Sequence, residues 1–484
     1  MKPGIVIGRQ SELNLLQKIE LSTQAEFLAV YGRRRVGKTY LITTFFKDKG
    51  VFFEMTGLKD GDQKTQIRIF TQELGNAFFH GKAPEPPTDW MGALELLRLQ
   101  VENMPRNQKI ILFFDELPWI ATAKSNFLGA VDHYWNRYFS RMPNIILIVC
   151  GSAASWMIDH VISSTGGLYG RLTHKMRLEP FSLAETEQYL IANHVQLDRK
   201  QIIELYMSIG GVPKYLNQVE PGQSTAQFIN KQFFSGTGYL LGEFNKVYSS
   251  LFKDYQKHIH IVRVLSKSPN GLDRTELLKK SGFESGGTVS KILRELEESG
   301  FICKINFFQM KKSLSKYRLI DQYSLFYLQW VESIEKTTLY NPNTNYWNQQ
   351  VNSQAWKVWC GYAFENICLL HVEKIVQALG LGGVQVKAFV WYVRGGSAKK
   401  GAQIDLLLDR ADGCINLCEI KYADQAFELT KKYAEELEQK KEIFRSETGC
   451  KKSLFTTMIT TRGLVQNRYA TQFVQAQATM DVLF

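Results

Sequence analysis

The spacing of apolar and polar residues predicts two differently built parts of the chain. In the first part, amphipathic stretches alternate with continuous apolar runs at residues 27–31, 51–55, 109–116 and 144–157. Such runs suit the strands of a parallel sheet that is buried on both faces. We therefore predict an α/β domain with a parallel sheet over residues 1–182, followed by a helical lid over residues 183–254.

The pattern changes after residue 255. Three short amphipathic helices and then two β-rich runs are predicted over residues 255–325, an order typical of a winged helix. The third helix carries Ser290, Lys291 and Arg294 on its polar side. These residues are compatible with DNA readout, and a winged helix that packs against protein and ties the first domain to the last is an equal alternative. An aromatic helix and a polar connection over residues 326–350 form a predicted linker.

The last predicted domain covers residues 351–484. It begins with an amphipathic helix that carries Glu365. Two apolar runs, 403–409 and 414–422, flank the turn Ala411-Asp412-Gly413, which predicts a β-hairpin. The domain is thus expected to combine helices and a sheet.

A glycine-rich loop follows the first apolar run. Its sequence is Gly32-Arg33-Arg34-Arg35-Val36-Gly37-Lys38-Thr39-Tyr40, a complete G-x-x-x-x-G-K-[ST] motif between a strand and a helix. The glycines let backbone N–H groups face a phosphate, and the helix N-terminus adds a positive partial charge. Lys38 is expected to contact the β- and γ-phosphates, and Thr39 to ligate Mg²⁺. The predicted cofactors are therefore ATP and Mg²⁺, bound by residues 32–40.

Two carboxylates end the apolar run at 109–116. In a nucleotide hydrolase of this kind, Asp115 orders Mg²⁺ together with Thr39, and Glu116 polarises the attacking water. An ordinary pair of acids at a strand end is the alternative. The position of the pair, between the phosphate loop and another buried strand, favours the catalytic interpretation.

A second group of charged residues lies in the last domain. Asp405 is on the first strand of the predicted hairpin, and Glu419 and Lys421 share one face of the second strand. An acid followed by Glu-x-Lys on paired strands, after a helix with Glu365, is the layout of a PD-(D/E)xK nuclease. In that interpretation Asp405 and Glu419 hold Mg²⁺, Glu365 completes the acidic cluster, and Lys421 orients a water. The alternative is a set of solvent-facing charges on an edge strand.

Composition limits the classes of protein without choosing among them. The formal net charge of +12 is compatible with DNA or another acidic partner. No apolar run approaches the roughly 18 residues of a membrane span, and the N-terminal residues lack the apolar core of a signal peptide. We expect a cytoplasmic protein without a membrane partner. Seven scattered cysteines without a Cys-x-x-Cys pair disfavour a disulfide framework or a zinc site.

Several short motifs occur in a fixed order along the chain: Gly8-Arg9 with Glu12, GRRRVGKT, FFDE, CGSAASWM, LYGR and GGVPKYL. With them the chain resembles the archaeal-type ATPases, which are AAA+-related P-loop proteins of the STAND class. The resemblance covers almost the whole chain. It implies an AAA+-like parallel sheet with a helical lid, then a winged helix, then a restriction-endonuclease-like α/β domain.

The resemblance also implies roles for four residues outside the phosphate loop. The backbone at Gly8 would border the adenine, and Pro213 would pack on the base. Ser152 would sense the γ-phosphate, although a small residue at a strand–loop junction is the alternative. Arg171 is either an arginine finger or a structural surface arginine. A finger supplied to a neighbour's nucleotide would imply a homo-oligomer.

Three functions remain open from the sequence. The first is an ATPase that controls a DNA-directed module, which would be a metal-dependent nuclease if its site is active. The second is an ATP-dependent molecular switch whose winged helix and tail bind DNA or protein without cleavage. The third is a DNA-binding regulator that acts through the winged helix.

Overall fold

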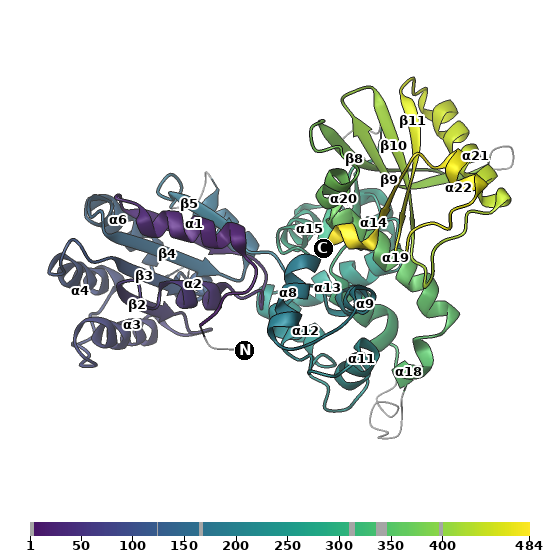
Figure 1. Cartoon of the computed structure of the whole chain (residues 1–484). Helices are drawn as coiled ribbons and strands as arrows, with labels where there is room; N and C mark the ends of the chain where they lie inside the picture. Colours follow the sequence, from purple (N-terminus) through teal and green to yellow (C-terminus); the bar gives the residue numbers. More distant parts are fainter. Residues whose placement is uncertain (1–3, 123, 164–167, 309–314, 335–345, 396–399) are drawn as a thin grey trace. The chain divides into compact units, whose positions relative to one another are not determined.

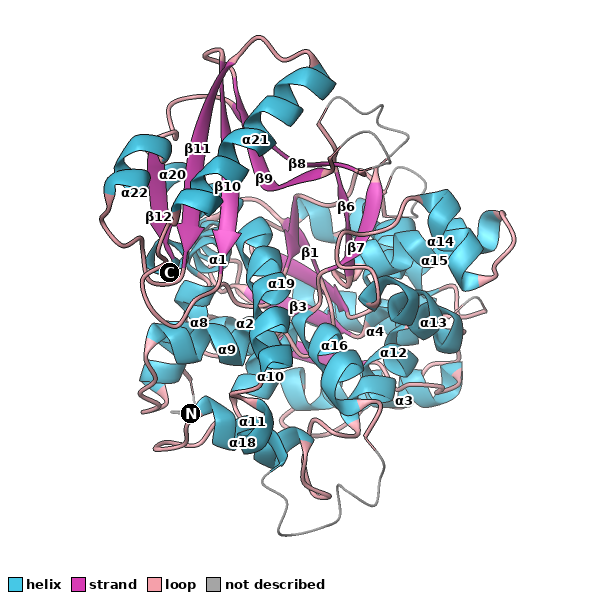
Figure 2. Ribbon diagram, turned by 90° about the vertical axis from the view of Figure 1, so that its right-hand side faces the viewer, coloured by secondary structure: helices cyan, strands magenta, loops and turns pink. Residues whose placement is uncertain are grey.

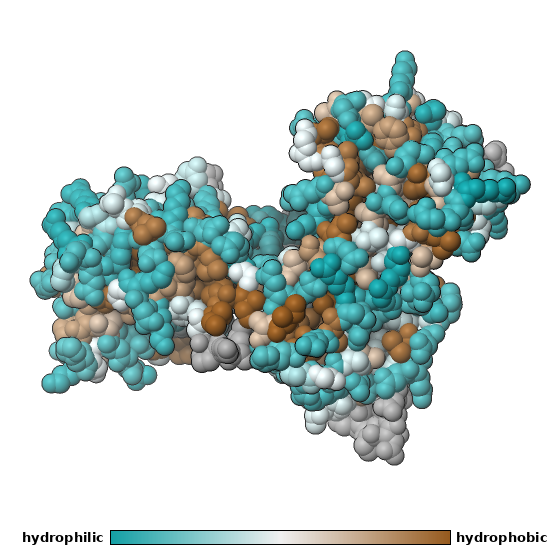
Figure 3. Space-filling model, in the orientation of Figure 1, coloured by the Kyte–Doolittle hydropathy of each residue, from teal (hydrophilic) through white to brown (hydrophobic). Residues whose placement is uncertain are grey.

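The computed structural model describes residues 4–122, 124–163, 168–308, 315–334, 346–395 and 400–484 (Figure 1). They form two compact units, which are described one at a time. The first unit comprises Met1–Pro180, Leu251–Lys253 and Arg294–Gly300, and the second comprises Phe181–Ser250, Asp254–Leu293 and Phe301–Phe484. On the face drawn in Figure 3, hydrophilic side chains cover most of each unit.

The first unit contains a five-stranded sheet in the order β2-β3-β4-β1-β5. Its strands are β1 (Glu26–Tyr31), β2 (Val51–Thr56), β3 (Ile110–Asp115), β4 (Ile145–Gly151) and β5 (His174–Arg177). Every pairing is parallel, and β3 and β4 are buried along their whole length. The predicted parallel sheet is therefore confirmed, and the apolar runs correspond to its strands.

Helices cover both faces of this sheet (Figure 1). They are α1 (Gln10–Leu21), α2 (Lys38–Phe46), α3 (Gln63–Phe78), α4 (Trp90–Glu102), α5 (Leu117–Ile120), α6 (Phe127–Arg137) and α7 (Ala154–Met157). Alternate residues of β1 belong to different cores: Phe27 packs with α3, α4 and α6, and Leu28 packs with α1 and α2. Each fully buried side chain of this size stabilises the fold by roughly 1.5–3 kcal/mol.

The second unit begins with helices, as the sequence predicts. These are α8 (Leu183–Ala192), α9 (Arg199–Ile209), α10 (Pro213–Leu216), α11 (Thr225–Phe233) and α12 (Glu243–Leu251). Ser182 and Ser224 begin α8 and α11 with complete capping boxes, and the Asp198 side chain caps α9. Each cap satisfies backbone N–H groups that the first turn of a helix leaves unpaired.

The next segment has the element order that was predicted for a winged helix. It contains α13 (Tyr255–Ser266), α14 (Arg274–Ser281), α15 (Gly287–Glu298), and the antiparallel strands β6 (Ile302–Ile305) and β7 (Lys316–Leu319). The helix α16 (Gln322–Phe326) and the π-helix η4 (Tyr327–Val331) follow. The assignment as a winged helix stays a prediction, and residues 335–345 of the predicted linker lie outside the described residues.

The C-terminal part is a mixed sheet with helices. Its sheet order is β12-β11-β10-β9-β8, from β8 (Val386–Val393), β9 (Ala402–Arg410), β10 (Cys414–Lys421), β11 (Ser453–Thr460) and β12 (Ala476–Thr479). The helices are α18 (Tyr346–Gln350), α19 (Gln354–Leu370), α20 (Val372–Ala378), α21 (Lys431–Thr448) and α22 (Arg468–Phe473). The helix α21 lies across one face of the sheet (Figure 2). The predicted hairpin is β9–β10, and β11 and β12 were not predicted.

The chain after β6 joins this sheet at its β8 edge. Phe308 N donates to Val390 O, and Val390 N donates to Asn306 O, both at 3.2 Å. The Phe308 ring also contacts the rings of Phe389 and Phe444. Backbone pairing and aromatic contacts therefore make residues 301–308 and the C-terminal sheet one packed body. The five predicted domain ranges stay predictions.

Within the described ranges, no helix is long and apolar enough to cross a membrane.

Candidate functional site

The phosphate loop has the backbone geometry that its glycines predict. Gly32 follows β1 with φ +142°, and a Cβ at this position would lie 2.2 Å from Leu178 O. Gly37 has φ +93° and precedes the first residue of α2, Lys38. A side chain at Gly32 would both clash and strain the backbone. The phosphate loop therefore requires glycine at position 32.

Lys38 lies folded over the loop rather than in solvent. Its side-chain Nζ donates to Gly32 O at 2.9 Å, Arg33 O at 3.0 Å and Ser152 Oγ at 3.1 Å. Only 6% of the residue is exposed. Three acceptors match the three N–H donors of an ammonium group. The cation is thus fixed at the position where the loop would receive a phosphate.

The carboxylates of Asp115 and Glu116 meet the loop from the end of β3. Thr39 Oγ1 donates to Asp115 Oδ2 at 2.6 Å, and Asp115 Oδ1 accepts from Glu116 N at 2.9 Å. Ser152 Oγ donates to Glu116 Oε1 at 2.6 Å. The sheet explains this convergence, because β1, β4 and β3 are neighbours and parallel, so their carboxyl ends share one edge.

Glu116 has a left-handed backbone, with φ 48° and ψ 49°. This conformation costs a non-glycine residue of order 1–3 kcal/mol and recurs at functional sites. This backbone conformation lets α5 begin directly after β3. The Glu116 side chain then reaches Ser152, which follows the end of the neighbouring strand β4. A chain of hydrogen bonds therefore links Glu116 to Lys38 through the Ser152 hydroxyl.

The Thr39 hydroxyl and the Asp115 carboxylate are the oxygen donors that Mg²⁺ prefers, and they touch each other. These two side chains would hold the ion that the sequence predicts. In the part of the chain that the structure describes, no group of three or more His, Cys, Asp or Glu side chains is arranged to hold a metal ion. A site of the Thr–Asp type needs only one such residue.

Arg9 is a residue of this site whose role the sequence did not reveal. It is 5% exposed, and its Nη2 donates to Val36 O at 3.2 Å and to Glu179 O at 2.6 Å. Arg9 therefore ties the middle of the phosphate loop to the segment after β5. Its place beside Gly8 in a motif was the available signal, and Gly8 itself has φ 67°.

The remaining loop residues differ in their surroundings. Arg33 and Val36 are buried, and Arg34 and Arg35 are partly exposed. Tyr40 Oη donates to Ile5 O at 3.0 Å. Arg35 has φ 74°, so the strained part of the loop includes one of its arginines.

Arg171 and Pro213 are the two remaining residues for which the sequence predicts a role at the nucleotide. Arg171 Nε donates to Asp132 Oδ1 at 2.9 Å, and 41% of the Arg171 side chain is exposed. Pro213 is the first residue of α10 and belongs to the second unit. The proposed finger and the proposed base contact both stay predictions.

Two of the predicted DNA-facing side chains have protein partners. Arg294 donates from Nη1 and Nη2 to the two carboxylate oxygens of Asp159, each at 2.9 Å, within the first unit. Ser290 Oγ accepts from Arg274 Nη2 at 2.9 Å. The bidentate pair of Arg294 would have to open before this side chain could contact DNA.

Three residues of the second predicted cluster, Asp405, Glu419 and Lys421, lie on β9 and β10. Glu419 Oε1 lies 2.9 Å from Lys421 Nζ and accepts from Tyr433 Oη at 2.7 Å. Glu419 Oε2 accepts from Lys440 Nζ at 2.7 Å. Asp405 Oδ2 accepts from Ile420 N at 3.0 Å, so it lies against the strand that carries Glu419 and Lys421.

Burial and neighbouring charges give the three carboxylates different pKa values. Burial, followed by the charge of Asp405, raises the pKa of Glu365 to about 8 against the opposing charges of Arg318 and Lys421. Burial, followed by the charge of Glu419, raises the pKa of Asp405 to about 6. Burial also acts on Glu419, but Lys421 and Lys440 outweigh it and lower its pKa. Carboxylates that perturb one another in this way lie close together.

Arg318, Tyr433 and Lys440 are cluster residues that the sequence did not reveal. Arg318 comes from β7, and its Nη2 lies 3.7 Å from Glu365 Oε2. Burial lowers the pKa of Arg318, which is 5% exposed. A cavity of about 20 Å³ borders Arg318, Glu365 and Asp405, enough for about one water. No motif spacing connects these residues, and only the fold brings them together.

Comparison with known proteins finds one family model, two relatives and several solved structures. Residues 7–219 match the family model described as "ATPase domain predominantly from Archaea", which is less than half of the chain. A Methanocaldococcus jannaschii protein, MJECL04, is 21% identical over 327 residues, 67% of this chain and 68% of that protein. An ATP-binding protein of the same organism, MJ0423, is 42% identical over 50 residues, 10% of this chain and 85% of that protein.

A solved structure, the Walker-type ATPase PABY2304 of Pyrococcus abyssi, is 14% identical, with a TM-score of 0.45. That likeness covers 67% of this chain and 96% of the other. The family match is therefore the comparison that bears on function. Residues 7–219, with the phosphate loop, Asp115, Glu116 and Ser152, are similar to an ATPase domain that occurs predominantly in Archaea.

Proposed function

We propose that the protein binds ATP with Mg²⁺ and hydrolyses it in the first unit. The observation that carries this proposal is the hydrogen-bonded network at the carboxyl edge of the sheet. It links Lys38 through Ser152 to Glu116, and Thr39 to Asp115. The match of residues 7–219 to an ATPase domain supports the same conclusion.

Each member of the network has a distinct task in this proposal. Lys38 exchanges its two loop carbonyls for phosphate oxygens and neutralises their charge. Thr39 and Asp115 hold Mg²⁺, which supplies charge neutralisation when bound. Glu116 accepts a proton from the attacking water as general base. Ser152 holds the Glu116 carboxylate in place and remains within reach of Lys38.

The test compares two lysines of the same segment. Lys38→Ala should abolish binding of a fluorescent ATP analogue and release of phosphate, because the phosphates lose their buried cation. Lys47→Ala is the matched control, since Lys47 is exposed at the end of α2. Normal turnover in Lys38→Ala would overturn the assignment. Loss of turnover in both variants would show a general effect of lysine removal on folding.

A metal-dependent phosphodiesterase in the second unit is the second candidate function. The convergence of Asp405, Glu419, Lys421 and Glu365 favours it. In the described arrangement, however, Lys421 and Lys440 both bond to Glu419. Binding of a cation by Glu419 therefore requires that at least one lysine move away. The non-cutting switch is the alternative, in which these lysines permanently replace a metal.

Calorimetry with Mn²⁺ and a cleavage assay on DNA distinguish these alternatives. A metal-dependent site should bind Mn²⁺, cleave only when the metal is present, and lose both properties in Asp405→Ala. Lys421→Ala should impair cleavage more than Mn²⁺ binding. Absence of Mn²⁺ binding to the wild-type protein favours the switch.

DNA binding, homo-oligomerisation and a cytoplasmic location are further parts of this proposal. The net charge of +12 supports an acidic partner such as DNA. Binding to DNA should weaken steeply with added salt, because counterions are released. If Arg171 acts on a neighbour's nucleotide, mixing Arg171→Ala with Lys38→Ala protein should restore part of the turnover. A rate per subunit that is independent of concentration, without rescue, would indicate that Arg171 is a finger in cis or a structural arginine.

A further inference from the structure

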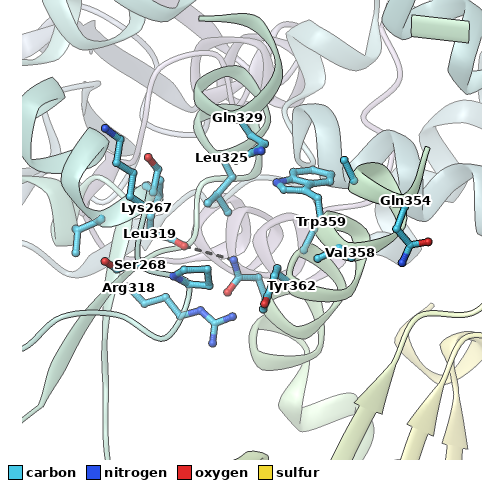
Figure 4. A pocket seen from close by; sticks show the side chains of 16 residues that line it. Lys267, Ser268, Arg318, Leu319, Leu325, Gln329, Gln354, Val358, Trp359 and Tyr362 are labelled. Carbon is cyan, nitrogen blue, oxygen red and sulfur yellow. Dashed lines mark hydrogen bonds between the residues drawn. The ribbon is translucent and has the colours of Figure 1, made fainter. Parts of the chain in front are cut away.

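The second unit contains a cavity that none of the sites above uses. Its volume is about 440 Å³, within the range of small-molecule sites. It lies between the end of α13 with the turn after it, β7, the segment α16–η4, and α19 (Figure 4). All these elements belong to one unit, so the cavity does not depend on how the two units are placed.

Apolar side chains form its walls and its mouth. Leu265, Leu319 and Trp359 are buried in the wall. Val358 and Tyr362 are 48% and 43% exposed on α19 and also border the cavity. Large apolar side chains that remain exposed at the mouth of a cavity indicate a surface that a ligand covers.

The charge inside the cavity has a single sign. Lys267 and Arg318 contribute to the lining, and none of the described residues that line it is acidic. Arg318 reaches from β7 toward Tyr362 (Figure 4). Such a lining attracts anions and disfavours cations.

Two buried side chains at this cavity have polar atoms without a hydrogen-bond partner among the residues that the structure describes. Arg318 is 5% exposed, and neither its Nε nor its Nη2 has a hydrogen-bond partner among the described residues. The ion pair of Nη2 with Glu365 is long, at 3.7 Å. Asn366 Oδ1 also lacks a partner in that part of the chain, although Asn366 Nδ2 donates to Leu319 O at 3.4 Å. Leaving such groups unpaired is costly, so a ligand that satisfies them would bind there.

We propose that this cavity binds a small amphipathic anion, with its apolar body against Leu265, Leu319 and Trp359 and its acidic head on Arg318. The head is a carboxylate, sulfonate or phosphate, because the guanidinium fork pairs with two oxygens of such a group. An uncharged apolar molecule would fill the walls but leave the Arg318 donors unpaired. A protonated donor group of the ligand could satisfy Asn366 Oδ1.

This binding site is connected to the carboxylate cluster through one residue. Arg318 lines both the 440 Å³ cavity and the small cavity that borders Glu365 and Asp405. An anion on Arg318 competes with Glu365 for the same guanidinium. The bound molecule would therefore alter the charge balance of the cluster without entering it.

The test uses the full chain and two fluorescent probes that share a phenylnaphthylamine body and differ in a sulfonate group. The anionic probe is 8-anilino-1-naphthalenesulfonate, and the neutral probe is N-phenyl-1-naphthylamine. The proposal expects one saturable site that prefers the anionic probe by about tenfold or more. Arg318→Gln should remove that preference, and Arg318→Lys should keep part of it. Binding of both probes with equal affinity to the wild-type protein would overturn the proposal.

Two tryptophan substitutions on α19 locate the site. Val358→Trp should weaken both probes about fivefold or more, because the ring fills the mouth of the cavity. Leu370→Trp is the matched control, since Leu370 is 45% exposed on the same helix and does not line the cavity. It should leave both affinities unchanged. Equal effects of Val358→Trp and Leu370→Trp would place the probes elsewhere and overturn the proposal, and this comparison holds even if Arg318→Gln fails to fold.

Competition with the bound probe identifies the head group. 1-Naphthoate and 1-naphthyl phosphate carry the same ring with a carboxylate or a phosphate. Displacement by either compound, and not by naphthalene, supports the proposal and names the preferred acid. Displacement by naphthalene as strongly as by both acids would contradict it, because the cavity would then bind the apolar body alone.

Discussion

The two carboxylate clusters of this protein are built in opposite ways. In the first unit, the Asp115 carboxylate bonds to a hydroxyl and to the backbone N–H of Glu116, so neither of these hydrogen-bond partners carries a charge. In the second unit, Glu419 bonds to two lysines. The first cluster thus keeps its charge available for a metal ion and water, whereas the second already neutralises much of its own charge.

This difference leads to different consequences for ligands. A cation entering beside Thr39 and Asp115 replaces one hydrogen bond. A cation entering beside Glu419 must displace a lysine that is held by a charge-assisted hydrogen bond. The comparison therefore predicts tight nucleotide–metal binding in the first unit and weak metal binding in the second.

The largest expected effect concerns Glu116. Glu116→Gln keeps the shape and the hydrogen bond to Ser152 but removes the base, so ATP turnover should fall about 10²–10⁴-fold while ATP affinity changes little. Single-turnover hydrolysis and equilibrium binding measure the two quantities. Glu73→Gln on α3 is a control that should leave both unchanged. Unchanged turnover in Glu116→Gln would exclude this residue as the base.

The next effect concerns the backbone that supports the first cluster. Gly32→Ala places a Cβ 2.2 Å from Leu178 O, and it also strains a φ of +142°. The first unit should lose more than about 2 kcal/mol of stability, together with ATP binding. Gly242→Ala is the control, because a Cβ there meets nothing within 4 Å. Chemical unfolding measures the stability of both variants. Equal stability of Gly32→Ala and Gly242→Ala would show that the phosphate loop can shift to accommodate a Cβ.

The first cluster could be predicted from the sequence because its parts are local or set by topology. The loop supplies Lys38 and Thr39 within one motif, and a parallel sheet brings the end of β3 beside it. The αL backbone of Glu116 and the role of Arg9 were not predictable, since both depend on contacts of the finished fold.

The second cluster could be predicted only in part. The hairpin placed Asp405, Glu419 and Lys421 correctly, because a turn and a period of two fix their register. Arg318 and Lys440 come from other elements, β7 and α21, and no spacing rule connects them to the hairpin. The sequence did not predict β11 and β12 either, because the pairing of β11 with β10 and of β12 with β11 depends on long-range contacts.

Lys440 tests how the second cluster balances its charge. Lys440→Ala removes one of two lysines from Glu419, which is 5% exposed, so the second unit should lose about 1–2 kcal/mol of stability. Lys432→Ala, an exposed position on the same helix, should have little effect. Urea unfolding measures both. The same comparison for Mn²⁺ is informative, since Lys440→Ala should increase metal affinity if the lysine occupies the place of a cation.

Glu365 should make the stability of the second unit depend on pH. Its pKa of about 8 in the folded protein exceeds the ordinary value of 4.5, so the folded state holds a proton that the unfolded state has lost. Stability therefore falls as the pH rises from about 5 to 8. In EDTA, Glu365→Gln should reduce the loss of unfolding free energy between pH 5 and 8 by about 1 kcal/mol or more. Glu373→Gln, at an exposed position, should leave that loss unchanged. An unchanged slope in Glu365→Gln would show that the carboxyl ionises freely.

The smallest expected effect has the opposite sign and concerns His371. Burial lowers the pKa of this imidazole, whose Nδ1 lies 2.8 Å from Ile367 O, while its Nε2 accepts from Leu183 N at 3.4 Å. The folded state thus prefers the neutral ring, so its contribution is fully present above the ordinary pKa of about 6.5 and is lost as the pH falls below it. One proton changes the free energy of unfolding by at most about 1.4 kcal/mol per pH unit.

His371→Gln should remove that part of the acid sensitivity, whereas His80→Gln, at an exposed position of the first unit, should not. If His371→Gln and His80→Gln lose stability equally as the pH falls, the buried imidazole of His371 does not contribute to the acid sensitivity of the second unit.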